Sequence, residues 1–369
     1  MLNDPTGPQS AVRAPRLRVV SDNKPLPGVI KASWTDNNYY QTSHFNLSFA
    51  ASAGPLGWWD VEPPLMIEID VSLDDGNSWT PMLTGEVDHI QFHIETGLIE
   101  MEGRDLSARL IEAKTQAAYV NKTSSEVAAT FAAEHHMQTN ITKTTALVGR
   151  YYEADHTNMS LGQFSKTTTE WDLLVYLARY EGFDCFMTGN TLNFIPTPLP
   201  SANPYVIQWT PPNSVPRANA ITISMERSLT LAKDVQVKVM SWNGRQGRGF
   251  TKTARAIGGK AAIATASSGG KPTTTQQYVF VIANLDEATA QKKANEFAHE
   301  ISLHERVVNV SMPGDVTLTP RNMFKLQGTQ TSFDQVYFCA SIDRSISFEE
   351  GYRQSIRLKN ASPRTMTQA

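Results

Sequence analysis

The sequence predicts a mainly β protein with an α+β part, in which two β units flank, and are bridged by, a helix-rich unit. Changes in the spacing of apolar residues carry this prediction. Apolar and polar residues alternate over residues 16–103, as in strands with one buried face. Over residues 104–197 the apolar residues recur at helical spacing, and after a proline-rich stretch the β pattern returns over residues 217–360.

The composition fits a folded protein of more than one domain. Its 369 residues suggest about two or three domains, and 19% of them are charged, below the roughly 25% of an average globular protein. The net charge of −3 gives no argument for binding nucleic acid or an anionic membrane. Cys185 and Cys339 each lie in an apolar run, which predicts buried, reduced thiols rather than a disulfide framework.

The sequence shows no sign of a membrane span or an export signal. No apolar stretch reaches the ~20 residues that a membrane-spanning helix needs, and residues 1–15 lack the hydrophobic region of a signal peptide. These first residues are polar and proline-rich, so we expect an arm that becomes ordered only against a partner. We expect the chain to be synthesised and folded in a cytoplasm, without membrane insertion.

The first β unit, residues 16–103, ends in an abrupt change from strand to helix. The segment EGRDLSARLIEAK contains Gly103, Arg104 and Asp105, after which Leu106 and Leu110 recur at helical spacing. An Arg–Asp pair at a strand end could be a chemical site, or it could mark a junction between domains. The junction is favoured: Asp105 is expected to cap the helix, and Arg104 to pair with a carboxylate or carbonyl there.

Residues 104–197 predict a compact unit of three helices followed by a hairpin. The clearest helix is EWDLLVYLARYEGF, which Gly182 should end, and the hairpin DCFMTGNTLNFIP should turn at Gly189-Asn190. The expected core residues of this unit are Trp171, Leu174, Leu177 and Phe183.

Residues 198–216 are proline-rich and predict a linker, followed by a second β unit at 217–369 with one helix over 284–305. Within it, residues 243–277 predict a weakly apolar insertion. From Lys238 to Lys271 the chain has seven cations and no Asp or Glu. Five of them are candidate contacts for an acidic partner: Arg245, Arg248, Lys252, Arg255 and Lys260. The competing interpretation is a mobile, solvated loop.

Chemical motifs give no evidence for catalysis or for a cofactor. The sequence has no nucleophile elbow, Walker loop, dinucleotide fingerprint or HExxH motif. His89 and His93 would suit a metal on a helix, but their surroundings predict a strand, where residues four apart lie ~13 Å from each other. His135 and His136 are adjacent at a predicted helix end. We therefore assign no catalytic, metal-binding or cofactor-binding residue.

Four segments occur in a particular order between about residues 80 and 360. They are LTGEVDHIQF with LIEMEGRDLSARLIEA; KTSSEVAATFAAEHHM; TTEWDLLVYLARYEGFDCFMTGNTLNFIP; and LDEATAQKKANEFAHEISLHERVVNVSMPGDVTLTPRNMFKLQG with VYFCASIDRSISFEEGYRQSIRLK. Together they resemble the baseplate hub proteins of contractile phage tails (the phage late control D family) and the hub region of type VI secretion spike proteins. Arg344 departs from the pattern, because such proteins often have a His in the segment before the final Gly-Tyr.

The resemblance implies two tail-tube-like β-barrels, at 16–103 and 217–369, around an inserted α+β domain at 104–197. It implies a non-enzymatic homotrimer whose ring of six similar barrels joins the sixfold tail tube to the threefold central spike. Tube and spike proteins are then the main partners, and baseplate wedge and tape-measure proteins are further candidates. Genome DNA would pass through the channel without specific binding, and the chain would be located in the virion, in the tail baseplate.

Two alternatives stay open from the sequence. One is a tail-associated cell-wall hydrolase or protease with an unrecognised site, which an unpaired acidic cluster in a cleft would favour. The other is a portal-type or adaptor protein that contacts DNA, which a basic channel would favour.

Overall fold

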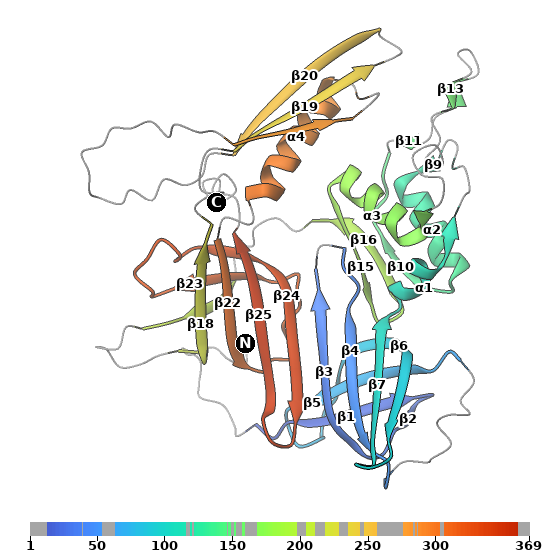
Figure 1. Ribbon diagram of the computed structural model, residues 1–369, viewed down its shortest axis with the longest axis vertical. Coiled ribbons are helices and arrows are strands. Elements are labelled where there is room, and N and C mark those ends of the chain that lie inside the picture. Colours follow the sequence, from blue (N-terminus) through green and yellow to red (C-terminus); the bar gives the residue numbers. More distant parts are fainter. Residues whose placement is uncertain are drawn as a thin grey trace.

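The computed structural model describes residues 13–38, 40–53, 63–115, 119, 122–145, 147–148, 151–152, 157–158, 168–197, 204–210, 218–228, 235–243, 247–256, 276–282, 285, 287–302 and 306–360. Two β halves lie side by side and share one large sheet (Figure 1). A helical unit lies above the first half, and a small unit of three strands and one helix stands at the top of the view.

The first half has the strand order β3-β4-β7-β6-β5-β1-β2. Its strands are β1 Arg16–Ser21, β2 Lys24–Pro25, β3 Val29–Asn37, β4 His44–Ala50, β5 Met66–Ser72, β6 Thr80–His93 and β7 Leu98–Asp105. The long β6 pairs with β5 in its first part and with β7 in its last part, and β1 and β5 cross behind β3 and β4 (Figure 1). The alternation seen in the sequence buries Phe45, Leu47 and Phe49 of β4 in the core between these layers.

The second half has the strand order β18-β22-β25-β24-β23-β17. Its strands are β17 Tyr205–Gln208, β18 Thr222–Arg227, β22 Arg306–Pro313, β23 Met323–Gln327, β24 Val336–Ser347 and β25 Gly351–Asn360. Strand β17 lies inside the predicted linker 198–216. The short apolar run there buries Tyr205 and Ile207 in the core of this half, where they pack with Phe324 and Leu326 of the neighbouring strand.

The two halves repeat one strand order. In chain order, strands β1, β3, β4, β5, β6 and β7 correspond to β17, β18, β22, β23, β24 and β25, and the lateral order is the same in both halves. One pairing differs in direction, since β1 is antiparallel to β5 whereas β17 is parallel to β23. This shared strand order is consistent with the similarity of the two β units that the resemblance implied, although β17 comes from the predicted linker and not from residues 217–369.

Strand β24 joins the halves. Its first residues pair with β23, and residues Ser341–Ser347 pair with Lys31–Asn37 of β3. This continuation leaves an open path of strands from β18 to β2, so the described strands do not close into the two barrels expected from the resemblance.

The middle unit has the predicted order of helices and hairpin. Its helices are α1 Ser107–Glu112, α2 Ser124–Glu134 and α3 Glu170–Glu181, and β15 Phe183–Thr188 and β16 Thr191–Pro196 form the hairpin. β10 Gln138–Ile141 pairs with β16. Short pairs join β8 Lys114–Thr115 to β14 Thr168–Thr169, β9 Lys122–Thr123 to β11 Leu147–Val148, and β12 Tyr151–Tyr152 to β13 Thr157–Asn158.

Local chemistry explains where these helices begin and end. Thr123 forms a capping box with Glu126 at the start of α2, and the side chain of Thr169 accepts from the backbone N–H of Asp172 at the start of α3. Gly182 ends α3 with a φ of 74°. The N-cap of α1 is Leu106 rather than the predicted Asp105, because Asp105 is still the last residue of β7.

The fourth unit lies between β18 and β22 in the chain. Its sheet has the order β20-β19-β21, with β19 Val235–Asn243, β20 Arg248–Ala256 and β21 Gln276–Val281, and α4 Glu287–Ser302 packs on one face. Ala290, Ala294 and Ala298 line the buried side of α4. The predicted insertion 243–277 thus includes strand β20, and its residues 257–275 lie outside the described part.

Within the part of the chain that the structure describes, no helix is both long and apolar enough to span a lipid bilayer.

Truncating Leu177 tests the core of the middle unit. This side chain is completely buried among α2, α3 and the hairpin. Leu177→Ala should lower the free energy of unfolding by about 2–5 kcal/mol, because it removes buried methyl groups and leaves a cavity. Glu134→Ala, at an exposed position of α2, should change it by less than about 0.5 kcal/mol. Denaturant unfolding measures both, and equal small effects would contradict this packing.

Candidate functional site

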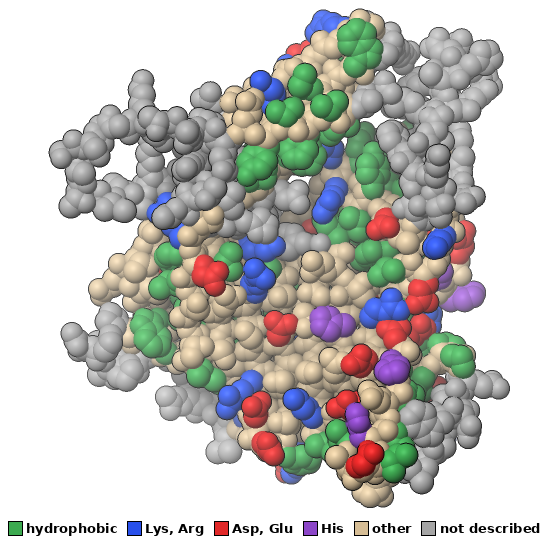
Figure 2. Space-filling model, viewed as in Figure 1, with side chains coloured by type: hydrophobic (Ala, Val, Ile, Leu, Met, Phe, Trp, Pro, Cys, Tyr) green, Lys and Arg blue, Asp and Glu red, His purple; other side chains and the backbone are tan. Residues whose placement is uncertain are grey.

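The shared sheet presents a broad polar face to solvent. Along β25, for example, buried Gln354, Ile356 and Leu358 alternate with exposed Arg353, Ser355 and Arg357. Figure 2 shows mainly small polar side chains and backbone across this face, with isolated charged and His side chains. We call "polar face" the outward side chains Ser33, Thr35, His44, Asn46, Ser311, Asp343, Ser345, Arg353 and Ser355.

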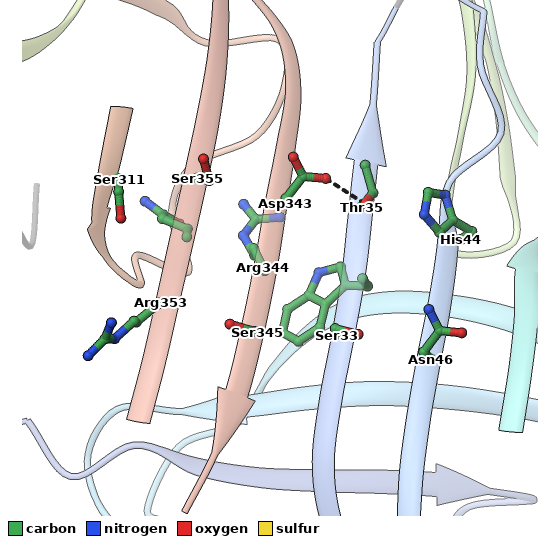
Figure 3. Close-up of a pocket in the computed structure, with 12 residues that line it drawn as sticks. Ser33, Thr35, His44, Asn46, Ser311, Asp343, Arg344, Ser345, Arg353 and Ser355 are labelled. Atoms are coloured by element: carbon green, nitrogen blue, oxygen red, sulfur yellow. Dashed lines mark hydrogen bonds between the residues drawn. The ribbon is translucent and has the colours of Figure 1, made fainter. Parts of the chain in front are cut away.

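A shallow hollow of about 350 Å³ lies on the polar face where β24 meets β3. Thr35 donates a hydrogen bond of 2.6 Å to Asp343 across this joint, and His44 and Asn46 stand on the next strand (Figure 3). The residues come from both halves, so the hollow exists only because the halves share one sheet. Its chemistry is that of a hydrated surface, with single charges set among hydroxyl and amide groups.

Arg344 lies beneath this face, at the centre of the joint. Its side chain is fully buried, forms an ion pair with Asp36 and donates to the carbonyl oxygen of Leu318 at 2.5 Å. In register it faces Trp34, whose ring stacks on Tyr352 at 6.1 Å. Burial lowers the pKa of the Arg344 guanidinium and raises that of Tyr352 to about 12. Arg344 is therefore a buried cation at the contact between the two halves, with partners from both of them.

Gly103 is required by close packing at the end of β7. A Cβ atom there would lie 2.1 Å from the carbonyl oxygen of Glu86 and 2.3 Å from the ring of Phe45. Gly85, on the facing strand, would place its Cβ 2.9 Å from the same ring. The ring of Phe45 therefore occupies the space that two side chains would need, which brings β4, β6 and β7 together.

Arg104 and Asp105 tie the strand end to its surroundings. Arg104 donates two hydrogen bonds to Asp88, at 2.6 and 2.7 Å, and one of 2.6 Å to Glu112 of α1. The oxygens of Asp105 accept from the backbone N–H groups of Ser107 at 2.9 Å and Ser43 at 2.8 Å. Burial raises the pKa of Asp105, against the effect of these donors. These contacts join the end of β7 to α1 and to the segment before β4, and the role of the pair as a domain junction stays a prediction.

Three contacts that the sequence did not single out hold the middle unit to the sheet. Trp171 donates its indole N–H to the carbonyl oxygen of Tyr40 at 3.0 Å, and Tyr40 donates its hydroxyl to the carbonyl oxygen of Phe183 at 2.7 Å. Arg321 forms an ion pair of 2.5 Å with Asp184. A cavity of about 430 Å³, lined by both polar and apolar side chains, lies between the β15–β16 hairpin and the shared sheet. No local sequence pattern marks Tyr40 or Arg321.

Among the predicted core residues, Leu174 and Leu177 are completely buried and Trp171 is 5% exposed. Phe183 is half-buried and packs at the edge of the same core, with its ring 5.3 Å from that of Phe194.

Three of the five candidate basic residues lie in the described part of the chain. Arg248 and Lys252 of β20 both lie against the carboxylate of Glu287 in α4, and Lys252 lowers the pKa of this carboxyl. The segment without acidic residues ends before Glu287. Because Glu287 lies against Arg248 and Lys252, the net positive charge around β20 is smaller than the sequence suggested. Arg255 lies in β20; Arg245 and Lys260 lie outside the described residues.

The histidines noted in the sequence lie in separate places. His89 and His93 are on β6, where His93 lies 3.3 Å from Glu100. His135 follows α2 and lies 2.7 Å from Glu170 at the start of α3, which links two helix ends. In the described part of the chain, no group of three or more His, Cys, Asp or Glu residues is arranged to hold a metal ion.

Comparison with solved structures identifies similar folds at low sequence identity. A tail protein from Neisseria meningitidis has a TM-score of 0.69 at 15% identity, covering 94% of this chain and 97% of that one. A 43 kDa tail protein of prophage MuSo2 from Shewanella oneidensis has 0.64 at 14%, covering 94% and 98%. An Escherichia coli type VI secretion component, itself similar to T4 bacteriophage tail proteins, has 0.52 at 10%, covering 95% and 78%. No family model and no curated protein sequence matches. The chain therefore has the fold of these proteins.

Gly103→Ala tests the close approach of β4, β6 and β7. The added methyl group meets backbone as well as the ring of Phe45, so neither neighbour can simply rotate away. We expect the free energy of unfolding to fall by about 1–3 kcal/mol in denaturant unfolding, the usual cost of overpacking. Ser48→Ala, a small change on β4 at a half-buried position, should be nearly neutral. A neutral Gly103→Ala would contradict the packing described.

The pH dependence of stability tests the burial of Asp105. Because burial raises its pKa from 3.8, the folded chain binds a proton at this carboxyl more readily than the unfolded chain does. The stability it contributes is fully present below its unfolded pKa and is lost as pH rises through the folded pKa, by up to about 1.4 kcal/mol per pH unit.

Asp105→Asn removes this titration while keeping one acceptor. The free energy of unfolding of the wild type minus that of this variant should therefore fall as the pH is raised from about 4 to about 8 in a urea series. A difference that stays constant or rises with pH would contradict the assignment. Asp105→Ala, which leaves the N–H groups of Ser43 and Ser107 without this acceptor, should cost about 1–3 kcal/mol at neutral pH.

Proposed function

We propose that this chain is a structural protein of a contractile phage tail, the hub of its baseplate. Three copies form a ring that adapts the sixfold tail tube to the threefold central spike. The fold shared with the tail proteins of Neisseria and Shewanella supports this assignment, as does the resemblance of the four sequence segments. The role is one of assembly rather than catalysis, and the location is the virion.

One observation carries the ring. Within the chain, the last part of β24 in the second half pairs with β3, the outermost strand of the first half. Their counterparts in the repeat are the last part of β6 and strand β18. Among the described residues, His89–His93 of β6 pair with β7 alone, and β18 ends the sheet. The two unpaired edges of the chain are therefore the counterparts of the two strands that pair with each other inside it.

Pairing β6 of one copy with β18 of the next would use the same geometry between chains as within them. The contact is head-to-tail, and a head-to-tail contact closes into a ring when the rotation per chain divides a full turn. With two similar halves per chain, three chains give six similar positions around the axis. Such a ring matches a sixfold tube on one side and a threefold spike on the other.

In this ring the polar face lines the axial channel. Its hydroxyl and amide groups and scattered charges of both signs suit a water-filled passage through which DNA moves without being held. Tube and spike proteins are the principal partners, with baseplate wedge and tape-measure proteins as further ones. The basic residues of β20 and its neighbouring segment remain candidate contacts with an acidic surface of such a partner.

Paired cysteines test the ring directly. Gln91→Cys on β6 is combined in turn with a cysteine in place of Thr222, Ser224 or Glu226 of β18, because the register between chains is unknown. Paired strands bring Cα atoms to ~4.5–5.5 Å, within the reach of a disulfide. The native Cys185 and Cys339 are each 1% exposed and should not react.

Oxidation of the concentrated or assembled protein should give at least one pair with a covalent ladder that stops at three chains on a non-reducing gel. Gln91→Cys combined with Ser355→Cys, which lies in the middle of the polar face, should give no such ladder. The ring is wrong if no β6–β18 pair cross-links, and its closure at three is wrong if the ladder continues to larger species.

A further inference from the structure

The two hairpins that end the shared sheet at one side carry unusually exposed apolar side chains. Phe348 lies at the turn between β24 and β25 and is 82% exposed; Ile94 lies at the turn between β6 and β7 and is 77% exposed. The strand directions place both turns at the same end of the sheet, at the bottom of the view (Figure 1). Exposing a side chain of this size without a partner is unfavourable in water.

The two turns are counterparts in the repeat of the halves. In each, the apolar residue directly follows the last paired residue of the long strand, Ser347 or His93, and a Glu comes next. A glycine with positive φ also lies where the chain enters the second strand of each hairpin: Gly97, at 64°, directly precedes β7, and Gly351, at 68°, is the first residue of β25. The chain therefore places the same chemical group at the same position of both halves.

The turns are held by internal hydrogen bonds. The backbone N–H of Gly97 donates to the carbonyl oxygen of His93 at 2.8 Å, and the backbone N–H of Glu350 donates to the hydroxyl of Ser347 at 3.1 Å. A turn that is ordered before binding loses less conformational entropy on contact. The apolar side chain therefore projects from a fixed base, as an anchor residue of an interface does.

The charged side chains within each turn are acidic. Glu95 follows Ile94, and Glu349 and Glu350 follow Phe348, with no Lys or Arg inside either turn. The cations beside the Phe348 turn lie on strands, where Lys31 is opposite Ser347 and Arg353 donates to the carbonyl oxygen of Glu350. A surface that accepts both turns must offer an apolar socket with Lys or Arg at its rim. An anionic membrane fits less well, because its surface potential repels these carboxylates. A second copy meeting tip to tip would bring like charges together.

We propose that the Ile94 and Phe348 turns are equivalent docking points for a single partner protein that repeats one apolar socket, rimmed by basic residues, around an axis. The proposal rests on the hub ring proposed above, which would carry six such points at one end. Each contact is small, so the affinity comes from engaging several at once. Because each of the three chains carries two equivalent turns, the ring would present six similar docking points, whereas one turn per chain would give only three.

Site-specific photo-cross-linking tests this docking. Benzoylphenylalanine replaces Ile94 or Phe348 in the full chain, in cells that produce the complete assembly, and the cross-linked peptides are sequenced by mass spectrometry. Both positions should attach to the same segment of the same protein, with Lys or Arg close by. A third position, Ile221, which is 52% exposed beside β18, should not yield that segment.

Charge reversal supplies a second readout. Glu95→Lys and Glu349→Lys should each reduce the yield of this cross-link severalfold, whereas Glu102→Lys, at an exposed position on β7 away from the turns, should not. Circular dichroism establishes that the variants fold.

The proposal is overturned if the two turns attach to different proteins, to lipid or to another copy of this chain, or if neither attaches to anything. The cysteine ladder separates the two proposals, since a ladder of three chains with unlike cross-links would retain the ring and reject the shared partner. A shared socket without any β6–β18 cross-link would retain the docking points and reject the ring.

Discussion

One strand, β24, pairs on the same edge with two others, and the rest of the architecture depends on it. Its first residues complete the second half through β23, and its last residues continue the sheet into the first half through β3. Backbone hydrogen bonds are satisfied along nearly the whole strand, so neither half has to bury an unpaired edge at the joint. The cost is that the joint brings polar groups into the interior, and Arg344 with Asp36 is the most evident of them.

The joint divides the sheet chemically as well as structurally. On one side, Trp34, Tyr352 and the aromatic residues of β4 form a continuous apolar layer; on the other, serine, threonine and asparagine side chains face solvent. The layer beneath is packed so closely that Gly85 and Gly103 leave room for no side chain. A closely packed sheet with a hydrated surface suits the wall of a passage through which another molecule moves, as in the proposed channel.

The sequence predicted local structure well because local chemistry determines it. Gly182 ends α3 as predicted, and the alternation along β4 and β25 sets their buried faces; these signals lie within a few residues of the element they control. The coarse order of two β regions around a helical unit follows from the same signals. Strand β17 was missed because prolines on both sides of a short apolar run favour a linker.

Long-range contacts could not be predicted in this way. The pairing of Trp34 with Arg344 joins strands from the first and last parts of the chain, and no periodicity marks it. Arg344 stood out only as a departure from the pattern of the proteins that the chain resembles, and Glu287 lay well beyond the acid-free window in which the cations near Lys252 looked unopposed. The equivalence of β6 with β24 becomes visible only when the lateral order of the strands is known.

A reconstruction of the assembled particle by electron cryomicroscopy tests the central claim most directly. The account predicts three copies around the axis, with the sheet passing from β6 of each chain to β18 of the next and the polar face turned toward an open channel. A particle in which these two strands are not adjacent, or in which the polar face is buried against another protein, would contradict it.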